Sequence, residues 1–93
     1  MQNPLLEILA RDESSGFILE RHELPAGFRA EKHRHTEFEW VYVVSGTLQD
    51  EFGSYPAGSF KLNEKDSIHE SFTETGCSLL VFTAGKRAPI VPF

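Results

Sequence analysis

Short apolar runs alternate with turn residues along the whole chain. The runs are rich in Phe, Val, Ile, Leu and Tyr, and they are bounded by turn clusters such as Ser45–Gly46. Runs of this length and spacing are typical of strands in a sandwich or barrel. We therefore predict an all-β fold, with strands near 17–24, 28–34, 37–45, 47–52, 58–62, 67–72 and 77–84.

The two ends of the chain are less regular. Within the N-terminal segment 1–16, the stretch PLLEILARDE fits a short helix and an edge strand equally well. The C-terminal segment 85–93, GKRAPIVPF, contains Pro89 and Pro92, and proline cannot donate to a β-ladder. We expect this segment to be an edge or an arm that packs on another subunit. With 93 residues, the chain 1–93 is expected to form a single domain.

Alternation of side chains assigns two faces to the segment that begins at His33. Residues of one parity point to the same side of a strand. His33, His35 and Glu39 therefore share a face, and this face continues as two valines. Trp40 and Tyr42 lie on the opposite face, where we expect packing between sheets or subunits.

The shared face combines imidazole and carboxylate groups with apolar positions, which predicts a metal site. Burial of such groups without partners costs several kcal/mol. A divalent ion such as Fe, Mn, Ni, Cu or Zn removes this cost, because nitrogen and carboxylate oxygen are its natural ligands. The residues alone leave the ligand set open. Glu37 has the parity of Glu39, and a further ligand is sought from His22, which has charged neighbours and favours a solvated face, or from His69 in the apolar run SIHESF.

Charge and composition narrow the classes of partner. The net charge is −5, with acidic residues spread along the chain, which argues against nucleic acid and against an anionic membrane surface. The single cysteine, Cys77, excludes an internal disulfide and is expected to be buried. No apolar stretch approaches about 18 residues, and the N-terminus does not read as a signal peptide, so we expect a cytoplasmic protein. Three phenylalanines, Phe60, Phe72 and Phe82, are expected to fill the core.

Two motifs in this sequence resemble those of the cupin superfamily. The first cupin motif, G-x5-H-x-H-x3,4-E-x6-G, is matched at every fixed position by Gly27, His33, His35, Glu39 and Gly46. The motif spacing selects Glu39 over its neighbour of the same parity.

The second cupin motif, G-x5-P-x-G-x2-H-x3-N, is matched only in part. Gly58 and His69 stand at the expected positions, whereas Glu64, Asp66 and Thr73 replace Pro, Gly and Asn. Asp tolerates the left-handed backbone conformation better than most residues, so Asp66 is expected to replace the glycine of this turn.

The segment 55–82 is similar to one branch of the superfamily. The turn Tyr55–Ser59, the histidine that follows it and the pair Gly76–Cys77 carry this similarity. The branch contains the cupin domain of anti-sigma factors that respond to singlet oxygen, and proteins similar to acetylacetone dioxygenase.

The resemblance implies a small antiparallel jelly-roll β-barrel, also called a double-stranded β-helix, with a divalent metal (Fe, Zn, Mn or Ni) at its centre. The ligands it implies are His33, His35, Glu39 and His69. An octahedral ion held by them has two further positions for water, substrate or O2, whereas a closed tetrahedral zinc has none.

Three functions are consistent with this site. The first is a dioxygenase-like enzyme that acts on a small oxygenated organic molecule. The second is a metal-binding sensor or regulatory module resembling the anti-sigma-factor cupin domain, acting as a free-standing relative. The third is a non-catalytic cupin that binds a small ligand or whose metal only stabilises the barrel. In each case the expected partners are a small molecule and a second copy of the chain in a homodimer.

Overall fold

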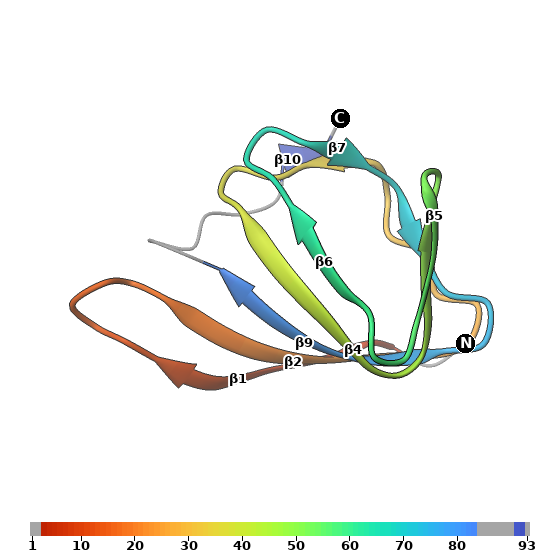
Figure 1. Ribbon diagram of the computed structural model, residues 1–93, viewed down its shortest axis with the longest axis horizontal. Coiled ribbons are helices and arrows are strands. Elements are labelled where there is room, and N and C mark those ends of the chain that lie inside the picture. Colours follow the sequence, from red (N-terminus) through yellow and green to blue (C-terminus); the bar gives the residue numbers. More distant parts are fainter. Residues whose placement is uncertain (1–2, 84–90, 93) are drawn as a thin grey trace.

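The computed structural model describes residues 3–83 and 91–92, and all regular elements among them are strands (Figure 1). None of the described residues forms a helix that is long and apolar enough to cross a membrane. The strands are β1 (Leu5–Arg11), β2 (Ile18–Leu24), β3 (His33–Arg34), β4 (Glu39–Asp50), β5 (Gly53–Pro56), β6 (Phe60–Asn63), β7 (Ile68–His69), β8 (Ser71–Phe72), β9 (Cys77–Thr83) and β10 (Val91–Pro92).

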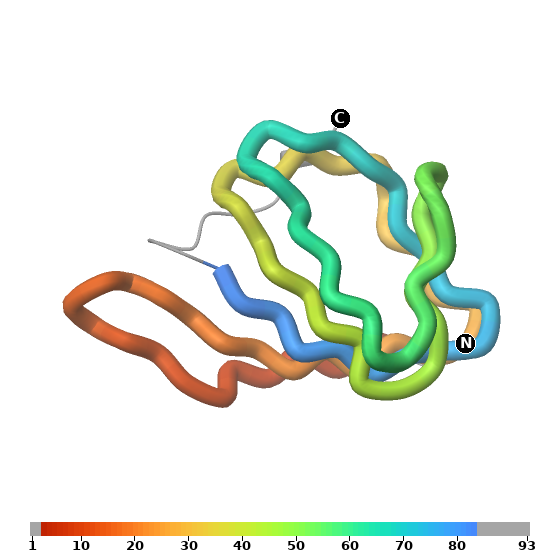
Figure 2. Tube along the Cα trace, in the orientation of Figure 1, coloured from red at the N-terminus to blue at the C-terminus, as the bar shows by residue number. Residues whose placement is uncertain are grey.

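The strands form two antiparallel sheets that curve around a shared interior (Figure 2). The larger sheet has the order β1-β2-β9-β4-β5, and β6 and β8 also pair with β4. The smaller sheet has the order β10-β3-β7 and lies at the top of Figure 1. The core consists of apolar side chains from β4 and β9: Val41, Val43, Leu48, Cys77, Leu79 and Val81. The predicted all-β jelly-roll barrel is thereby confirmed.

The first half of β4 follows the predicted alternation. Val41 and Val43 are 2% and 0% exposed, whereas Trp40 and Tyr42 are each 37% exposed on the outer face. Phe60 packs edge-on against Trp40 on this outer face and is 66% exposed, and Phe82 lies beside Trp40 on the same face, so the predicted place of both phenylalanines in the core is wrong. The inner face therefore has small β-branched residues, and the aromatic rings lie outside.

The predicted break at Ser45–Gly46 is wrong, because β4 continues through it to Asp50. The register with β9 shifts between Val43 and Ser45, which marks a β-bulge with one extra residue in β4. Beyond the bulge the even positions point inward, so Leu48 and Asp50 are buried. Strand parity is therefore inverted in the second half of β4.

The segment PLLEILARDE forms an edge strand, β1, rather than a helix. β1 pairs antiparallel with β2, and all its residues are exposed. In the C-terminal segment, residues 91–92 form β10 at the edge of the smaller sheet, paired with β3. The remainder of the predicted arm, 85–90 and 93, lies outside the described residues.

The turn before β7 confirms the expectation for Asp66. Its φ is 69°, the left-handed conformation that the cupin motif gives to glycine. The backbone N–H of Asp66 donates to the carbonyl of His35 at 2.8 Å, so this turn also holds the end of β3. The altered second motif thus preserves the backbone geometry that places His69.

Candidate metal centre

Three histidines meet where β3 pairs with β7. His33 on β3 lies directly opposite His69 on β7 in the antiparallel register. His35 follows the end of β3, and its backbone N–H donates to the carbonyl of Ser67 at 3.0 Å. The three residues are 8%, 6% and 3% exposed for His33, His69 and His35, so backbone pairing holds all of them in the interior.

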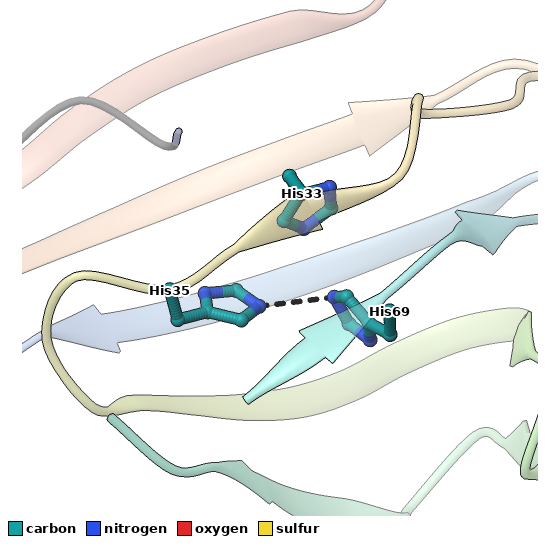
Figure 3. A group of neighbouring side chains, drawn as sticks. All are labelled: His33, His35 and His69. Atoms are coloured by element: carbon teal, nitrogen blue, oxygen red, sulfur yellow. Dashed lines mark hydrogen bonds between the residues drawn. The ribbon is translucent and has the colours of Figure 1, made fainter. Parts of the chain in front are cut away.

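The three rings converge on one point (Figure 3). Their centroids are 4.7 to 4.9 Å apart, and a nitrogen atom of each ring lies within 4.8 Å of the others. The distance between the Nε2 atoms of His35 and His69 is 3.0 Å. Two nitrogens that bind one ion at about 2.1 Å and at right angles are about 3.0 Å apart. The spacing therefore fits two adjacent ligands of a single metal ion.

The outer nitrogens of two rings already have hydrogen-bond partners. Nδ1 of His33 donates to the carbonyl of Glu31 at 2.6 Å, and Nδ1 of His69 contacts a carboxylate oxygen of Asp50 at 3.3 Å. A carbonyl oxygen and a carboxylate oxygen can only accept a hydrogen bond. Each of the two rings therefore has its proton on Nδ1 and its lone pair on Nε2. This is the tautomer and orientation that second partners usually impose on histidine ligands of metals.

Asp50 belongs to a buried cluster that the sequence did not reveal. Its side chain is 1% exposed and forms an ion pair with Lys61. Its Oδ1 accepts hydrogen bonds from the Tyr55 hydroxyl at 3.0 Å and from the Phe52 backbone N–H at 2.9 Å. Lys61 Nζ is also 3.4 Å from Nδ1 of His69, but it lies closer to Asp50, to which it donates a hydrogen bond. The cluster therefore holds Asp50 as the acceptor for His69.

The protonation states in this cluster suit metal binding. Burial alone would raise the pKa of Asp50, but hydrogen bonds from Lys61 and from the Phe52 N–H hold it below its usual value. Burial and the charge of Lys61 lower the pKa of His69, against the opposing effect of Asp50. Near neutral pH, Asp50 is therefore charged and His69 is neutral, which is the form that binds metals.

Glu39 lies beside the histidines without joining their cluster of converging nitrogens. It is 9% exposed, and its Oε1 accepts a hydrogen bond from Nδ2 of Asn63 at 3.1 Å. The same oxygen is 4.0 Å from Nδ1 of His35. Glu37 lies in the bend before β4 and is partly exposed. Of these two carboxylates of equal parity, Glu39 is the one that lines the interior.

A cavity of about 180 Å³ adjoins the histidines. Its polar wall is formed by His33, His35, His69, Glu39, Asn63 and His22. Its apolar wall includes Leu24, Val41, Leu48, Leu79 and Val81. A small organic molecule in this cavity would touch the histidines at one side and hydrocarbon at the other.

The solvated position expected for His22 is wrong, because this residue lines the cavity. Its side chain is 15% exposed, and Nε2 lies 2.8 Å from Oε1 of Glu20. The charged neighbours of His22 point to the other face of β2. A signal was present in the alternation, since Ile18, Glu20, His22 and Leu24 share one parity that begins and ends with apolar residues.

The family of the chain follows from its sequence. Residues 7–86 match the family described as the ChrR Cupin-like domain. The chain is a member of this cupin family. No curated protein matches it.

Solved structures show the same fold at low identity. An RmlC-like cupin protein from Ralstonia eutropha JMP134 is 20% identical, with a TM-score of 0.78 over 88% of this chain and 56% of that one. The complex of SigE with the anti-sigma ChrR from Rhodobacter sphaeroides contains a match at 23% identity and a TM-score of 0.77, over 86% of this chain and 44% of that one. This cupin thus spans about half the length of these structures.

An enzyme is also among the structures similar to this cupin. An acetylacetone dioxygenase from Acinetobacter johnsonii is 13% identical, with a TM-score of 0.79 over 95% of this chain and 70% of that one. At such identities, the similarity establishes the barrel fold and leaves the activity to be argued from the site.

Proposed function

We propose that this cupin binds a divalent metal ion through His33, His35, His69 and Glu39. The observation that carries the proposal is the convergence of three buried imidazoles, two of them with Nε2 atoms 3.0 Å apart. Glu39 is assigned as the fourth ligand because it is buried beside His35 and faces the same cavity. Its carboxylate would supply the one oxygen ligand of the set.

We further propose a dioxygenase-like activity on a small oxygenated organic molecule. When bound, the metal would supply Lewis-acid and oxygen-binding chemistry. The protein supplies the rest: Asp50 and the Glu31 carbonyl orient the ligand rings, and the apolar wall of the cavity excludes water from the reacting groups. Three neutral imidazoles and one carboxylate compensate only one charge of a divalent ion. A site of this charge favours an anionic or oxygen-rich ligand.

The experiment is anaerobic reconstitution with Fe(II), followed by oxygen uptake in the presence of pentane-2,4-dione. Uptake that requires iron, the dione and His69 supports the enzyme, and we expect His69→Ala to abolish it. Tightly held zinc in a closed four-coordinate site, with no uptake after iron loading, would reject it. The exposed variant Glu64→Ala is the control for handling, because Glu64 lies in a surface turn.

A sensor or regulatory module is the second candidate. Two observations favour it: the family is described by ChrR, and the structure of the SigE complex with the anti-sigma ChrR matches this barrel. In this case the metal would hold a ligand-responsive barrel without turnover. The iron and oxygen experiment separates the two functions, since a sensor binds metal through the same residues but consumes no oxygen.

A further inference from the structure

Besides the three histidines, the interior contains a pair of polar side chains, Glu20 and His22, on the larger sheet. Glu20 and His22 lie on β2, a strand of the larger sheet, and share its inner face with buried Ile18, whereas the three histidines come from β3, β7 and the residue that follows β3. The side chains of Glu20 and His22 are 9% and 15% exposed. His22 and the three histidines line the same cavity, so a molecule bound there contacts both groups.

The contact between Glu20 and His22 defines which nitrogen of His22 is available. Nε2 lies 2.8 Å from Oε1 of Glu20, and a carboxylate accepts but does not donate. The proton of the neutral ring is therefore on Nε2, and the lone pair is on Nδ1. Nδ1 of His22 has no hydrogen bond to the residues that the structure describes, so it is available to a ligand in the cavity.

This arrangement is that of an acid–base group with an orienting carboxylate. The charge of Glu20 stabilises the imidazolium that forms when Nδ1 takes a proton, as a carboxylate does for other catalytic imidazoles. The pair is separate in sequence from the four proposed ligands, and it lies on a different strand from each of them. Its chemistry can therefore be tested without removing a metal ligand.

The cavity limits the size of the molecule on which the pair could act. A volume of about 180 Å³ equals that of about six water molecules in the liquid, well below the roughly 300 Å³ at which pockets for drug-sized ligands begin. A molecule of a few carbon atoms matches this volume. Its polar group would face the histidines and its hydrocarbon part the leucines and valines of the apolar wall.

We propose that His22, oriented by Glu20, transfers a proton to and from the carbon next to the carbonyl group of a small ketone in this cavity. Nδ1 takes the proton, the C–H electron pair forms a carbon–carbon double bond, and the carbonyl π pair moves to oxygen, which gives an enolate. The imidazolium returns a proton to the same carbon and restores the ketone. The inference rests on the proposed function, because the enolate oxygen needs the positive charge of the proposed metal.

The first test follows hydrogen–deuterium exchange of hydroxyacetone in D2O by proton NMR, with the zinc-loaded protein. Zinc has no redox chemistry, so oxygenation does not interfere. We expect exchange to be faster than with zinc alone and to fall by about 100-fold or more in His22→Gln, the scale of general acid–base catalysis. Equal exchange by His22→Gln and wild type, or no acceleration by wild type, would overturn the proposal.

The readouts separate this proposal from the proposed function. Zinc content is measured in the same samples, and His22→Gln should retain the zinc of wild type. If wild type does not bind zinc, the proposed metal centre is wrong. If wild type binds zinc but does not accelerate the hydrogen–deuterium exchange, only the proposed role of His22 is wrong.

The second test reads the tautomer directly by nitrogen-15 NMR of the histidine side chains, without a metal. We expect the neutral ring of His22 to have its proton on Nε2 in wild type, and this preference to weaken in Glu20→Leu, which has no acceptor for Nε2–H. Glu23→Leu is the matched control, because Glu23 lies on the same strand but on the opposite face, where it contacts Ser78 and Arg21. A proton on Nδ1 in wild type would contradict the assigned role of Glu20.

Discussion

Asp50 is the residue that links the interior charges to the candidate metal centre. It receives a hydrogen bond from His69 and balances the charge of Lys61, so one buried carboxylate both orients a proposed ligand and neutralises a cation. Carboxylates in this position are a recurrent second partner of metal-bound histidines. Asp50 should therefore affect metal affinity although it is not a proposed ligand.

Replacement of Asp50 by Asn is expected to weaken zinc binding by about 10- to 100-fold, because the charged acceptor for His69 is lost. Competition with a chromophoric chelator measures this change. Asp12→Asn is the control, since Asp12 is an exposed acceptor for serine side chains in the turn between β1 and β2. Equal zinc affinity of Asp50→Asn and wild type would show that Asp50 has no role in orienting His69.

Tyr55 gives the cluster a measurable signature at alkaline pH. Burial and the hydrogen bond to Asp50 raise the pKa of Tyr55 to about 12. An unfolded tyrosine loses its proton near pH 10, so between pH 10 and 12 the folded state binds more protons. The neutral Tyr55 hydroxyl therefore makes its full contribution to the free energy of unfolding below pH 10, and this contribution is lost as the pH rises from 10 to 12.

Tyr55→Phe lacks this titration, so its free energy of unfolding should fall less steeply than that of wild type between pH 10 and 12. Urea denaturation at several pH values in this range measures both slopes. Identical slopes would mean that the Tyr55 hydroxyl is not held in its neutral form by the cluster.

Sequence patterns predicted the clustered histidines better than the side chains that contact them. The motif spacing identified His33, His35 and His69, because the register of short strands is encoded locally by turns. Asp50 could not be found in this way, since its inward orientation depends on the bulge in β4. The inward position of His22 was not predicted, because its neighbours Arg21 and Glu23 are charged, although the alternation of β2 places His22 on the inner face.

At the scale of elements, the bulge in β4 decides which residues enter the barrel. Gly46 has a φ of 74°, and a Cβ at this position would lie 2.1 Å from the carbonyl oxygen of Gly76 and 2.8 Å from Cα of Cys77. The close approach of β4 and β9 at this point therefore requires glycine. The sequence motif correctly marked Gly46 as important, but its role is a bend within a strand rather than a turn between strands.

Gly46→Ala is expected to destabilise the protein by about 2–4 kcal/mol, since backbone strain and a clash with backbone atoms add together. Gly58→Ala is the matched control, because Gly58 also has a positive φ, 91°, but no atom lies within 4 Å of an added Cβ. Urea denaturation of both variants isolates the effect of the clash. Equal losses of stability would contradict the close packing of β4 against β9.

At the scale of the whole molecule, the outer face of the larger sheet has an apolar surface. We call the side chains Leu19, Trp40, Tyr42, Phe60, Leu80 and Phe82 the aromatic face. Within it, Phe60 is 66% exposed and contacts the rings of Trp40 and Tyr42. Exposed apolar clusters of this kind mark interaction sites. The homodimer expected from the sequence is therefore proposed to form through the aromatic face.

Light scattering coupled to size exclusion should show a dimer for wild type and a shift toward monomer for Phe60→Ser. Phe52→Ser is the control, because Phe52 is 74% exposed in the turn between β4 and β5 and is not part of the aromatic face. A monomeric wild type, or a dimer that survives Phe60→Ser unchanged, would refute this interface.

The central claim is that His33, His35, His69 and Glu39 hold one metal ion in the barrel. Metal analysis of purified wild type and of His69→Ala tests it most directly, with Glu39→Gln compared against Glu37→Gln. We expect an equimolar divalent metal in wild type and in Glu37→Gln, a reduced content in Glu39→Gln, and loss of the metal with a lower melting temperature in His69→Ala. Full metal occupancy in His69→Ala would contradict the proposed metal centre.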